Sequence, residues 1–177
     1  MDSRKVIVRR SPIAGTGVFA VDLITPGEIV ASFDGPFYDL DYPGWTPDLI
    51  NHAIQCGRDQ FRDSLGLARL VNHSCEPNCG IQRLFDIAAM RVIEPGEEIT
   101  WDYEMTEDSD WWRMPCHCGT ASCRKIIGAY RNLPEGVRMK YRGFISEWLS
   151  QAEGTPKPFG RREHGPLQPR LAPAGVT

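Results

Sequence analysis

The chain has 177 residues, of which 41% are hydrophobic and 24% are charged, and its formal net charge is −3. This length favours one domain with at most a small appendage, and the composition excludes a wholly disordered chain and a collagen-like fibre. No stretch approaches the ~20 apolar residues of a membrane span, and the balanced charge argues against a dedicated nucleic-acid binder. The first residues lead into an alternating strand pattern and not into an apolar signal core, so we expect an intracellular protein, cytoplasmic, or nuclear in a eukaryote or a host cell.

The N-terminal part of the chain predicts short strands. Residues 4–9 have an apolar centre and charged ends, which is typical of an edge strand, and a turn-rich loop follows at 11–17 before extended structure resumes at 18–20. Residues 24–30 (Ile-Thr-Pro-Gly-Glu-Ile-Val) are echoed by residues 93–99 (Ile-Glu-Pro-Gly-Glu-Glu-Ile). In each copy Pro sets φ for a tight turn and Gly can take the positive φ of a type II turn. The echo therefore predicts two strand–turn–strand units.

The segment between these units allows two interpretations. Residues 48–54 place apolar side chains on one helical face, which indicates a short helix. The alternation of His52, Ile54 and Cys56 equally indicates a strand that ends in a hairpin turn at 57–59. We favour the hairpin.

The C-terminal third predicts two short helices and a tail. Residues 134–141 and 146–151 have helical spacing, with Pro134 in a first turn, Gly143 as a stop and Ser146 as an N-cap. From residue 154 onward the chain has five Pro and four Gly in 24 residues, which predicts a flexible tail.

Charge is divided unevenly along the chain. Residues 94–110 carry eight acidic side chains and no basic one, whereas residues 124–177 carry ten Lys or Arg against four acids. We expect the acidic segment to form a face that attracts a basic peptide by Coulomb steering.

Six cysteines are many for an intracellular protein, and their spacing indicates a metal before a disulfide. Cys116, Cys118 and Cys123 lie within eight residues, with Gly119 at the bend, and three thiolates on a tight turn suit a structural zinc ion. The chain has neither the His-Glu-x-x-His motif of zinc proteases nor the signature of zinc deaminases. From spacing alone the fourth ligand remains open among Cys56, Cys75, Cys79 and His117.

Three segments together resemble the SET-domain family of protein lysine methyltransferases. They are residues 15–20 (Gly-Thr-Gly-Val-Phe-Ala), 69–78 (Arg-Leu-Val-Asn-His-Ser-Cys-Glu-Pro-Asn) and 98–103 (Glu-Ile-Thr-Trp-Asp-Tyr). The cysteine cluster is similar to the post-SET zinc motif of that family. The resemblance implies a mainly β fold of several small curved sheets, with short helices and a pseudo-knot that threads 72–78 and 101–103 together.

The same resemblance implies a division of the chain and an activity. A SET domain would span 1–110, a post-SET zinc-binding segment 111–127, short C-terminal helices 128–153 and the flexible tail 154–177. The activity would be transfer of methyl groups from S-adenosylmethionine (SAM) to a lysine amine of a basic protein such as a histone. The substrate would enter as an extended strand along an exposed sheet edge.

Individual residues take their expected roles from the matching motif positions. Tyr103 would be the catalytic tyrosine, and Phe33 and Trp101 would line the lysine channel. Cys75 would join the three clustered cysteines as the fourth zinc ligand. The residues expected to contact SAM are Gly15, Thr16, Gly17, Arg69, Asn72, His73 and Tyr103.

Chemistry supports these roles, and three positions depart from the family pattern. Methyl transfer is an in-line displacement that needs alignment and a neutral amine, and an apolar channel beside a sulfonium favours the neutral amine. The family often has a tyrosine where Phe33 stands and an aromatic residue where Thr16 stands, and Trp101 occupies its product-specificity position. These departures leave two alternatives open: an inactive SET module that binds a peptide or cofactor as an adaptor, and a zinc-stapled structural domain.

Overall fold

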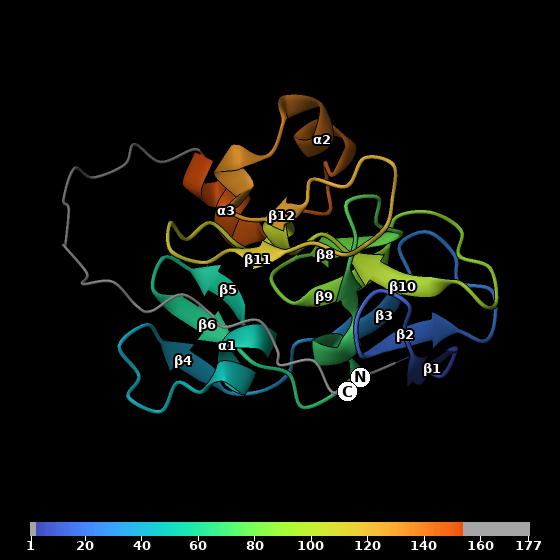
Figure 1. The fold of residues 1–177 in the computed structure, drawn as a ribbon, viewed down its shortest axis with the longest axis horizontal. Coiled ribbons are helices and arrows are strands. Elements are labelled where there is room, and N and C mark those ends of the chain that lie inside the picture. The colour runs from blue at the N-terminus through green and yellow to red at the C-terminus, as the bar shows by residue number, and fades with distance from the viewer. Residues whose placement is uncertain (1–2, 154–177) are drawn as a thin grey trace.

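The computed structural model describes residues 3–153, so the predicted flexible tail lies outside the described residues. The described part consists of short strands in small sheets, with few and short helices (Figure 1). The strands are β1 (Val6–Arg10), β2 (Thr16–Ala20), β3 (Ile29–Ser32), β4 (Phe37–Asp39), β5 (Ile54–Gly57), β6 (Gln60–Arg62), β7 (Asn72–His73), β8 (Cys79–Gln82), β9 (Asp86–Ala89), β10 (Glu98–Trp101), β11 (Met114–Pro115) and β12 (Ile126–Ile127). The helices are α1 (Pro47–His52), α2 (Glu135–Lys140) and α3 (Glu147–Glu153), with 3₁₀ turns η1 (Leu67–Leu70), η2 (Tyr103–Met105) and η3 (Tyr130–Asn132). Among the described residues, none of these helices has the length and apolar character to cross a bilayer.

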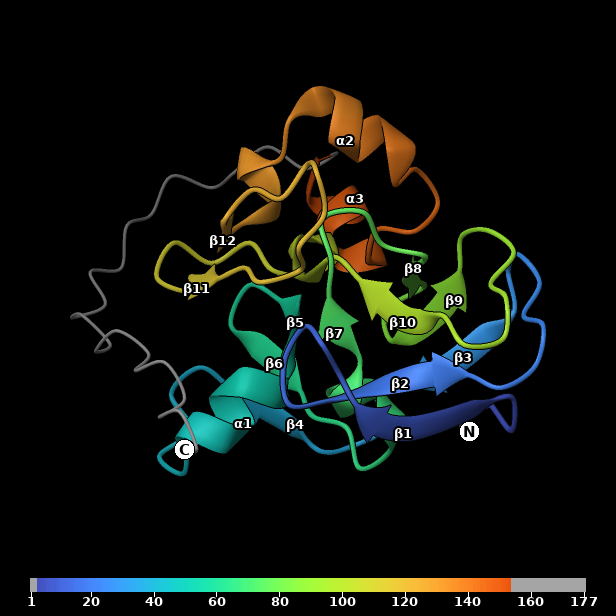
Figure 2. The ribbon, with the colours of Figure 1, turned by 45° about the vertical axis from the view of Figure 1, so that its right-hand side comes forward.

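A sheet in the order β1-β2-β10-β7 brings distant motifs together, and Figure 2 shows its strands side by side. The strand β1 lies at its edge, which confirms the expectation from residues 4–9. At the other end β7 pairs in parallel with β10, so that Asn72 lies opposite Thr100 and His73 opposite Trp101. The two segments of the expected pseudo-knot are therefore in direct contact.

The two Pro-Gly-Glu units pair with each other through equivalent backbone groups. Ile24 and Ile93 exchange two hydrogen bonds of 3.0 Å each. The amide of Gly27 donates to Ala89, and the amide of Gly96 donates to Ala20, each at 2.8 Å. Both glycines have positive φ, +81° and +94°, which confirms the expected turns. The pairing gives the core an approximate internal twofold symmetry, and the isoleucines at its centre are fully buried.

The segment before the second motif contains both structures that the sequence allowed. Residues 47–52 form α1, in which Pro47 occupies the first turn and Thr46 caps the helix by accepting a hydrogen bond from the Leu49 amide at 3.2 Å. The hairpin β5–β6 follows directly, as expected. Together with β4, these elements form one lobe of the molecule (Figure 1).

Both C-terminal helices form close to where they are expected. Gly143, with φ of +85°, ends the region after α2. Ser146 immediately precedes α3, but its buried Oγ has no hydrogen-bond partner among the described residues, so the expected side-chain cap is wrong. In its place the Ser146 backbone is held, because its amide donates to the Met105 carbonyl at 3.0 Å and its carbonyl accepts from Leu149.

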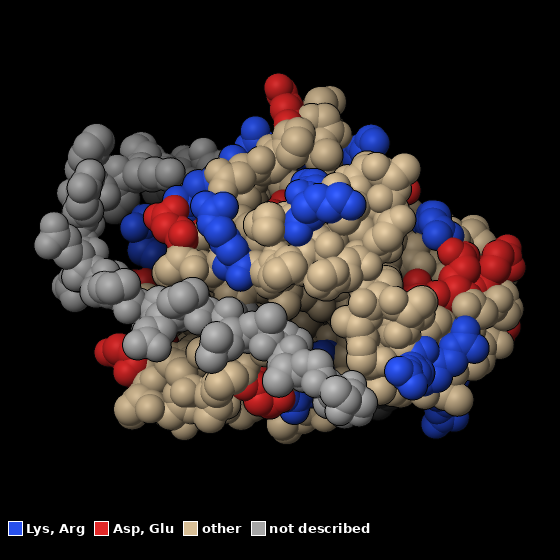
Figure 3. Space-filling view, in the orientation of Figure 1, with Lys and Arg blue, Asp and Glu red and all other residues tan. Residues whose placement is uncertain are grey.

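The expected acidic face does not exist as a surface, because much of the acidic segment turns inward. Asp102, Glu104 and Glu107 are buried, and arginines outside the segment pair with several others. Arg131 contacts Asp108 and Asp110, and Arg91 contacts Glu97. On the face drawn in Figure 3 the acidic side chains lie in small separate groups.

Candidate active site and metal centre

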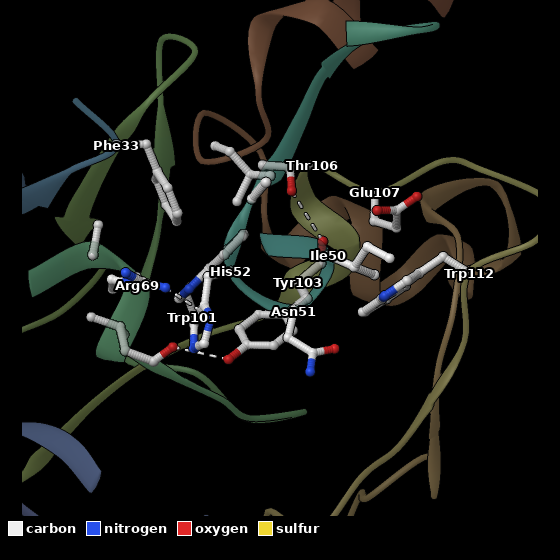
Figure 4. Close-up of a pocket in the computed structure, with 14 residues that line it drawn as sticks. Phe33, Ile50, Asn51, His52, Arg69, Trp101, Tyr103, Thr106, Glu107 and Trp112 are labelled. Atoms are coloured by element: carbon white, nitrogen blue, oxygen red, sulfur yellow. Dashed lines mark hydrogen bonds between the residues drawn. The ribbon is translucent and has the colours of Figure 1, made fainter. Parts of the chain in front are cut away.

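A narrow pocket collects residues from five parts of the chain (Figure 4). Its cavity volume is about 30 Å³, which is enough for a small chemical group and not for a whole cofactor molecule. Phe33 and Trp101 form one wall, and their rings meet edge to face with centroids 6.0 Å apart. Ile54 at the start of β5 and Trp112 before β11 also line it. The expected channel residues therefore lie together around one passage.

Tyr103 lines this pocket and is fixed at both ends. Its hydroxyl donates to the Val71 carbonyl at 3.0 Å, and its backbone amide donates to Nδ1 of His73 at 3.2 Å. Its ring lies 5.0 Å from that of Trp101, centroid to centroid. Burial raises the pKa of Tyr103, and the charge of Glu98 raises it further, so the phenol stays protonated at neutral pH.

The glycine loop lies next to the second motif. The Asn72 side-chain amide donates to the carbonyls of Ala14 and Thr16, at 3.2 and 3.1 Å, and to Glu98 at 2.8 Å. A side chain at Gly17 would overlap the ends of the Glu98 and Asn72 side chains, which would have to move away from the loop. Gly15 has a positive φ of +47° and supplies the turn. Since Asn72 follows Val71, the loop adjoins the segment that binds the Tyr103 hydroxyl.

Arg69 lies on the pocket side of the second motif. Its guanidinium is 2.7 Å from the Asp48 carboxylate and 3.2 Å from Nδ1 of His52, both on α1. Arg69 and His52 line the pocket, and Figure 4 shows them close to Trp101 and Tyr103. Arg69 thus ties α1 to the channel, and within residues 3–153 its side chain bonds to Asp48 and His52 and not to the loop at 15–17.

Four cysteines gather at the other side of Tyr103. The Sγ atoms of Cys75, Cys116, Cys118 and Cys123 all lie within 4.8 Å of one another, and those of Cys75 and Cys116 are 3.7 Å apart. A tetrahedral zinc ion with Zn–S bonds of ~2.3 Å places its sulfurs about 3.8 Å apart, so the donor set and its spacing fit zinc. Two other candidates for the fourth ligand, Cys56 in β5 and Cys79 in β8, are not part of this group. The cluster joins the cysteine that follows β7 to the turn between β11 and β12.

Polar groups around the cluster hold it against the core. The Arg124 amide donates to Cys75 Sγ at 3.3 Å, and Nε2 of His73 lies 3.4 Å from the same sulfur. The Arg124 guanidinium donates to both oxygens of Asp102 and lies 3.2 Å from Glu104. Burial lowers the pKa of His73 to about 3, with the charge of Arg124 acting in the same direction. Arg124, which follows Cys123, therefore binds the two residues that flank Tyr103.

Sequence reasoning missed the part of the pocket that α1 and its surroundings supply. These lining residues are Ile50, Asn51, His52, Ala53, Ala68, Thr106, Glu107 and Trp112. The stripe of apolar residues at 48–54 indicated only a packing face. The Thr46-Pro47 start signal would have placed the helix, but no local pattern shows that it faces Tyr103.

Comparison with known proteins assigns the family. The SET domain model matches residues 15–104, about half of the chain. The chain belongs to the SET-domain family.

The relatives match over a longer stretch than the domain model does. The chain is 31% identical over 149 residues to the histone-lysine N-methyltransferase trithorax of Drosophila virilis, which covers 68% of this chain and 4% of that protein. It is 45% identical over 136 residues to the histone-lysine N-methyltransferase 2D of Homo sapiens, which covers 68% of this chain and 2% of that protein. The chain thus spans only a small fraction of these relatives.

A solved structure shares the fold. The crystal structure of KRYPTONITE in complex with mCHG DNA and SAH matches with a TM-score of 0.55 and 27% sequence identity. The match covers 69% of this chain and 28% of that one. The arrangement of small sheets with few short helices is therefore that of the SET fold, as the motifs predicted.

Proposed function

We propose that this protein transfers methyl groups from SAM to the side-chain amine of lysine in a protein substrate. The observation that carries the proposal is the position of Tyr103, whose ring lines a narrow pocket beside Phe33 and Trp101 and whose hydroxyl is bound to the segment that holds the glycine loop. Membership of the SET family, the names of the relatives and the SAH in the KRYPTONITE complex support it.

The cofactor site has the features that SAM requires. The backbone of loop 15–17 accepts a hydrogen bond from the Asn72 side chain at the Thr16 carbonyl, and His73 follows in β7, where it pairs with Trp101. When bound, SAM supplies an electrophilic methyl group on a sulfonium sulfur. The residues expected to hold it are those of the loop together with Asn72, His73 and Tyr103.

The channel residues prepare the acceptor. Phe33 and Trp101 give one wall of the pocket an apolar surface, which disfavours a charged ammonium against it and so favours the neutral amine. The Tyr103 hydroxyl donates a hydrogen bond to the Val71 carbonyl. Its oxygen lone pairs therefore face the other way and can accept a hydrogen bond from the amine. Alignment and exclusion of water then supply most of the rate enhancement.

We further propose that the substrate binds as an extended strand between the lobe of α1 and β4–β6 and the segment that precedes β11. Ile54 begins β5, which is an edge strand of its sheet, and Trp112 precedes β11 across the pocket. An edge strand offers backbone groups to a peptide, and the pocket takes one side chain. The names of the relatives support a histone as substrate class, whereas the acidic segment gives no support because its members are largely buried or paired.

The test is methyl transfer by zinc-loaded protein from labelled SAM to recombinant histones and to a panel of basic peptides. We expect label on lysine, and none when the target lysine is replaced by arginine. Tyr103→Phe should lower kcat ~10- to 100-fold, because it removes an oriented hydrogen-bonding group worth about 1–3 kcal/mol. Tyr38→Phe, at a half-buried tyrosine of β4 outside the pocket, is the matched control and should keep full activity.

Two outcomes would contradict the proposal. Equal rates for Tyr103→Phe and wild type would remove the role of this tyrosine. Calorimetric binding of SAH without turnover across the whole panel would instead assign an adaptor that binds the cofactor.

A further inference from the structure

The strand β1 ends its sheet, so that within residues 3–153 no other strand pairs with its outer edge. Alternate residues of an antiparallel strand direct their backbone groups to opposite sides. At one end of β1 the Val21 amide donates to the Lys5 carbonyl at 2.8 Å. At the other end the Ser11 amide donates to the Gly15 carbonyl at 3.0 Å. The odd-numbered residues of this stretch therefore face β2.

The even-numbered residues of β1 direct their amides and carbonyls away from β2. They are Val6, Val8 and Arg10, and each lies opposite an even-numbered residue of β2. The same alternation continues in β2, because the Ala20 amide donates to the carbonyl of Glu97, just before β10, at 2.9 Å. We call the outward backbone groups of the three β1 residues the outer row. It offers the amide donors and carbonyl acceptors with which an added strand pairs.

Apolar side chains accompany the outer row on both faces of β1. Ile7 is 52% exposed and Val8 is 36% exposed, and they point to opposite faces because they are neighbours in a strand. β-Branched side chains pack well against those of an adjacent strand. Their exposure beside an unpaired edge therefore favours an extended polypeptide as the partner.

Charged side chains often block an edge strand, but Arg9 is held on the other side of β1. Its guanidinium carbon lies 3.9 Å from the centroid of the Phe19 ring in β2. The same guanidinium donates to the Gly96 carbonyl, in the turn before β10, at 3.0 Å. Both contacts draw the side chain toward β2, so that Arg9 leaves the outer row open.

Three arginines give the surroundings of the outer row a positive charge. Arg4 precedes β1, and Arg9 and Arg10 end it, and among the described residues none of the three forms an ion pair. The neighbouring Lys5 is paired with Glu28 at 2.9 Å. Figure 3 shows basic side chains gathered where β1 lies in Figure 1. In a chain of net charge −3, this local excess points to an acidic partner.

We propose that β1 binds an extended acidic segment of another protein, which adds a strand to the sheet. The proposal goes beyond the proposed function and does not rest on it. The span from Arg4 to Arg10 corresponds to about seven residues of a partner strand, or about 20 Å. The fitting segment has acids at both ends and β-branched residues between them.

Other occupants fit the edge less well. Phosphates of a nucleic acid only accept hydrogen bonds, so they would leave the outward carbonyls of the outer row without donors. A second copy of β1 would bring arginines against arginines, and like charges on adjacent strands are destabilising. An acidic strand satisfies both the backbone groups and the charges.

The first test follows backbone amides of the full chain by hydrogen exchange in NMR. The probe is the peptide Glu-Glu-Val-Thr-Val-Glu-Glu with blocked ends. In the free protein we expect the Ile7 amide, which faces β2, to be protected and the Val8 amide to exchange freely. Saturating peptide should slow exchange at Val6, Val8 and Arg10 at least ~10-fold. Unchanged exchange at these amides, or no binding at about 1 mM peptide, would overturn the proposal.

Two further peptides separate strand pairing from charge. Methylation of the three central backbone nitrogens keeps every charge and removes donors to the outer row, so binding should fall at least ~10-fold. Replacement of all glutamates by lysines keeps the backbone and should abolish binding at low salt. Equal affinities for the methylated and unmodified peptides would show that charge alone attracts them, and would overturn the strand pairing.

Variants of the protein locate the site. Val8→Pro removes one outward amide and none of the bonds to β2, so it should lose peptide binding and keep the Tm of wild type within about 4 °C. Arg10→Glu should weaken binding about 5- to 10-fold. The matched control is Arg142→Glu, at an exposed arginine after α2 that has no ion pair among the described residues, and it should bind like wild type.

Three results would assign the edge differently. Wild-type affinity in both Val8→Pro and Arg10→Glu would place the peptide elsewhere on the molecule. Tighter binding of a DNA duplex than of the peptide, lost in Arg10→Glu, would make the patch a phosphate site. A dimer of the protein alone that Val8→Pro dissociates, measured by analytical ultracentrifugation, would assign the edge to a second copy. Each of these results would overturn the proposal.

Discussion

The guanidinium of Arg124 donates to both carboxylate oxygens of the buried Asp102, at 2.8 and 2.7 Å. Asp102 precedes Tyr103, and Arg124 follows Cys123, so this pair joins the pocket to the cysteine turn. Glu104 also contacts the same guanidinium, which makes one cation the partner of two buried carboxylates. Breaking such an arrangement leaves charge buried without compensation.

Arg124→Met should therefore lower the free energy of unfolding by about 3–5 kcal/mol in the zinc-loaded protein. The matched control is Arg131→Met, because Arg131 also pairs with two carboxylates but at an exposed site, and it should cost less than ~1 kcal/mol. Urea unfolding followed by tryptophan fluorescence measures both. Equal losses would show that burial of Asp102 does not amplify the effect.

The glycine loop gives a second prediction. Gly17→Ala should weaken SAH binding ~10-fold, because the added methyl displaces the Glu98 carboxylate from Ser11 and Asn72 and so loosens the loop. Gly136→Ala, at an open position in α2, should leave SAH binding unchanged and raise stability by up to about 1 kcal/mol. Isothermal titration with SAH distinguishes them, and unchanged affinity in Gly17→Ala would place the cofactor elsewhere.

Metal content gives a third prediction. The purified chain should carry about one zinc ion, and Cys123→Ser should lose it and expose residues 111–126 to proteolysis, since the four thiolates join this turn to Cys75 through the metal. Cys56→Ser, outside the cluster, should retain zinc. Atomic absorption and limited proteolysis measure these effects. A metal-free wild-type protein with the same protease resistance would contradict the zinc site.

The pH dependence of stability gives the fourth prediction. Burial raises the pKa of Glu104 from 4.5 to about 7, with Asp102 acting in the same direction and Arg124 against it. The folded state therefore binds the Glu104 proton more tightly, and its contribution to stability is complete below pH 4.5 and is lost as pH rises to 7.

Glu104→Gln should remove this contribution. The difference in free energy of unfolding between wild type and Glu104→Gln should shift by about 2–3 kcal/mol against wild type between pH 4.5 and 7.5. Taking the difference cancels the separate effect of acid on zinc binding. A difference that is constant with pH would show that Glu104 titrates normally.

Local signals predicted much of the framework of the fold. The Pro-Gly turns placed the strands around 24–30 and 93–99, because proline and glycine restrict φ without help from the rest of the chain. The motif at 69–78 and the cysteines predicted contacts across long separations, and the structure brings Cys75 to the later three and Asn72 to the glycine loop. These distant contacts came from the family resemblance and not from periodicity.

The acidic segment shows where local signals fail. A run of acids with no base looks solvated, yet Asp102 and Glu104 are buried because Arg124 and Tyr141 reach them from 20 or more residues later. Sequence alone does not reveal such distant partners. For the same reason α1 was recognised as a helical face, whereas its position opposite Tyr103 was not.

The paired Pro-Gly-Glu units have a consequence for how this chain tolerates change. Their mutual hydrogen bonds hold the chain just before β3 and again at the end of β9, so the segment between them starts and finishes at fixed places. Insertions at the exposed residues 41–44 of that segment would alter loop-closure entropy only slowly with length. The chain can therefore change in length there while the paired units keep their hydrogen bonds.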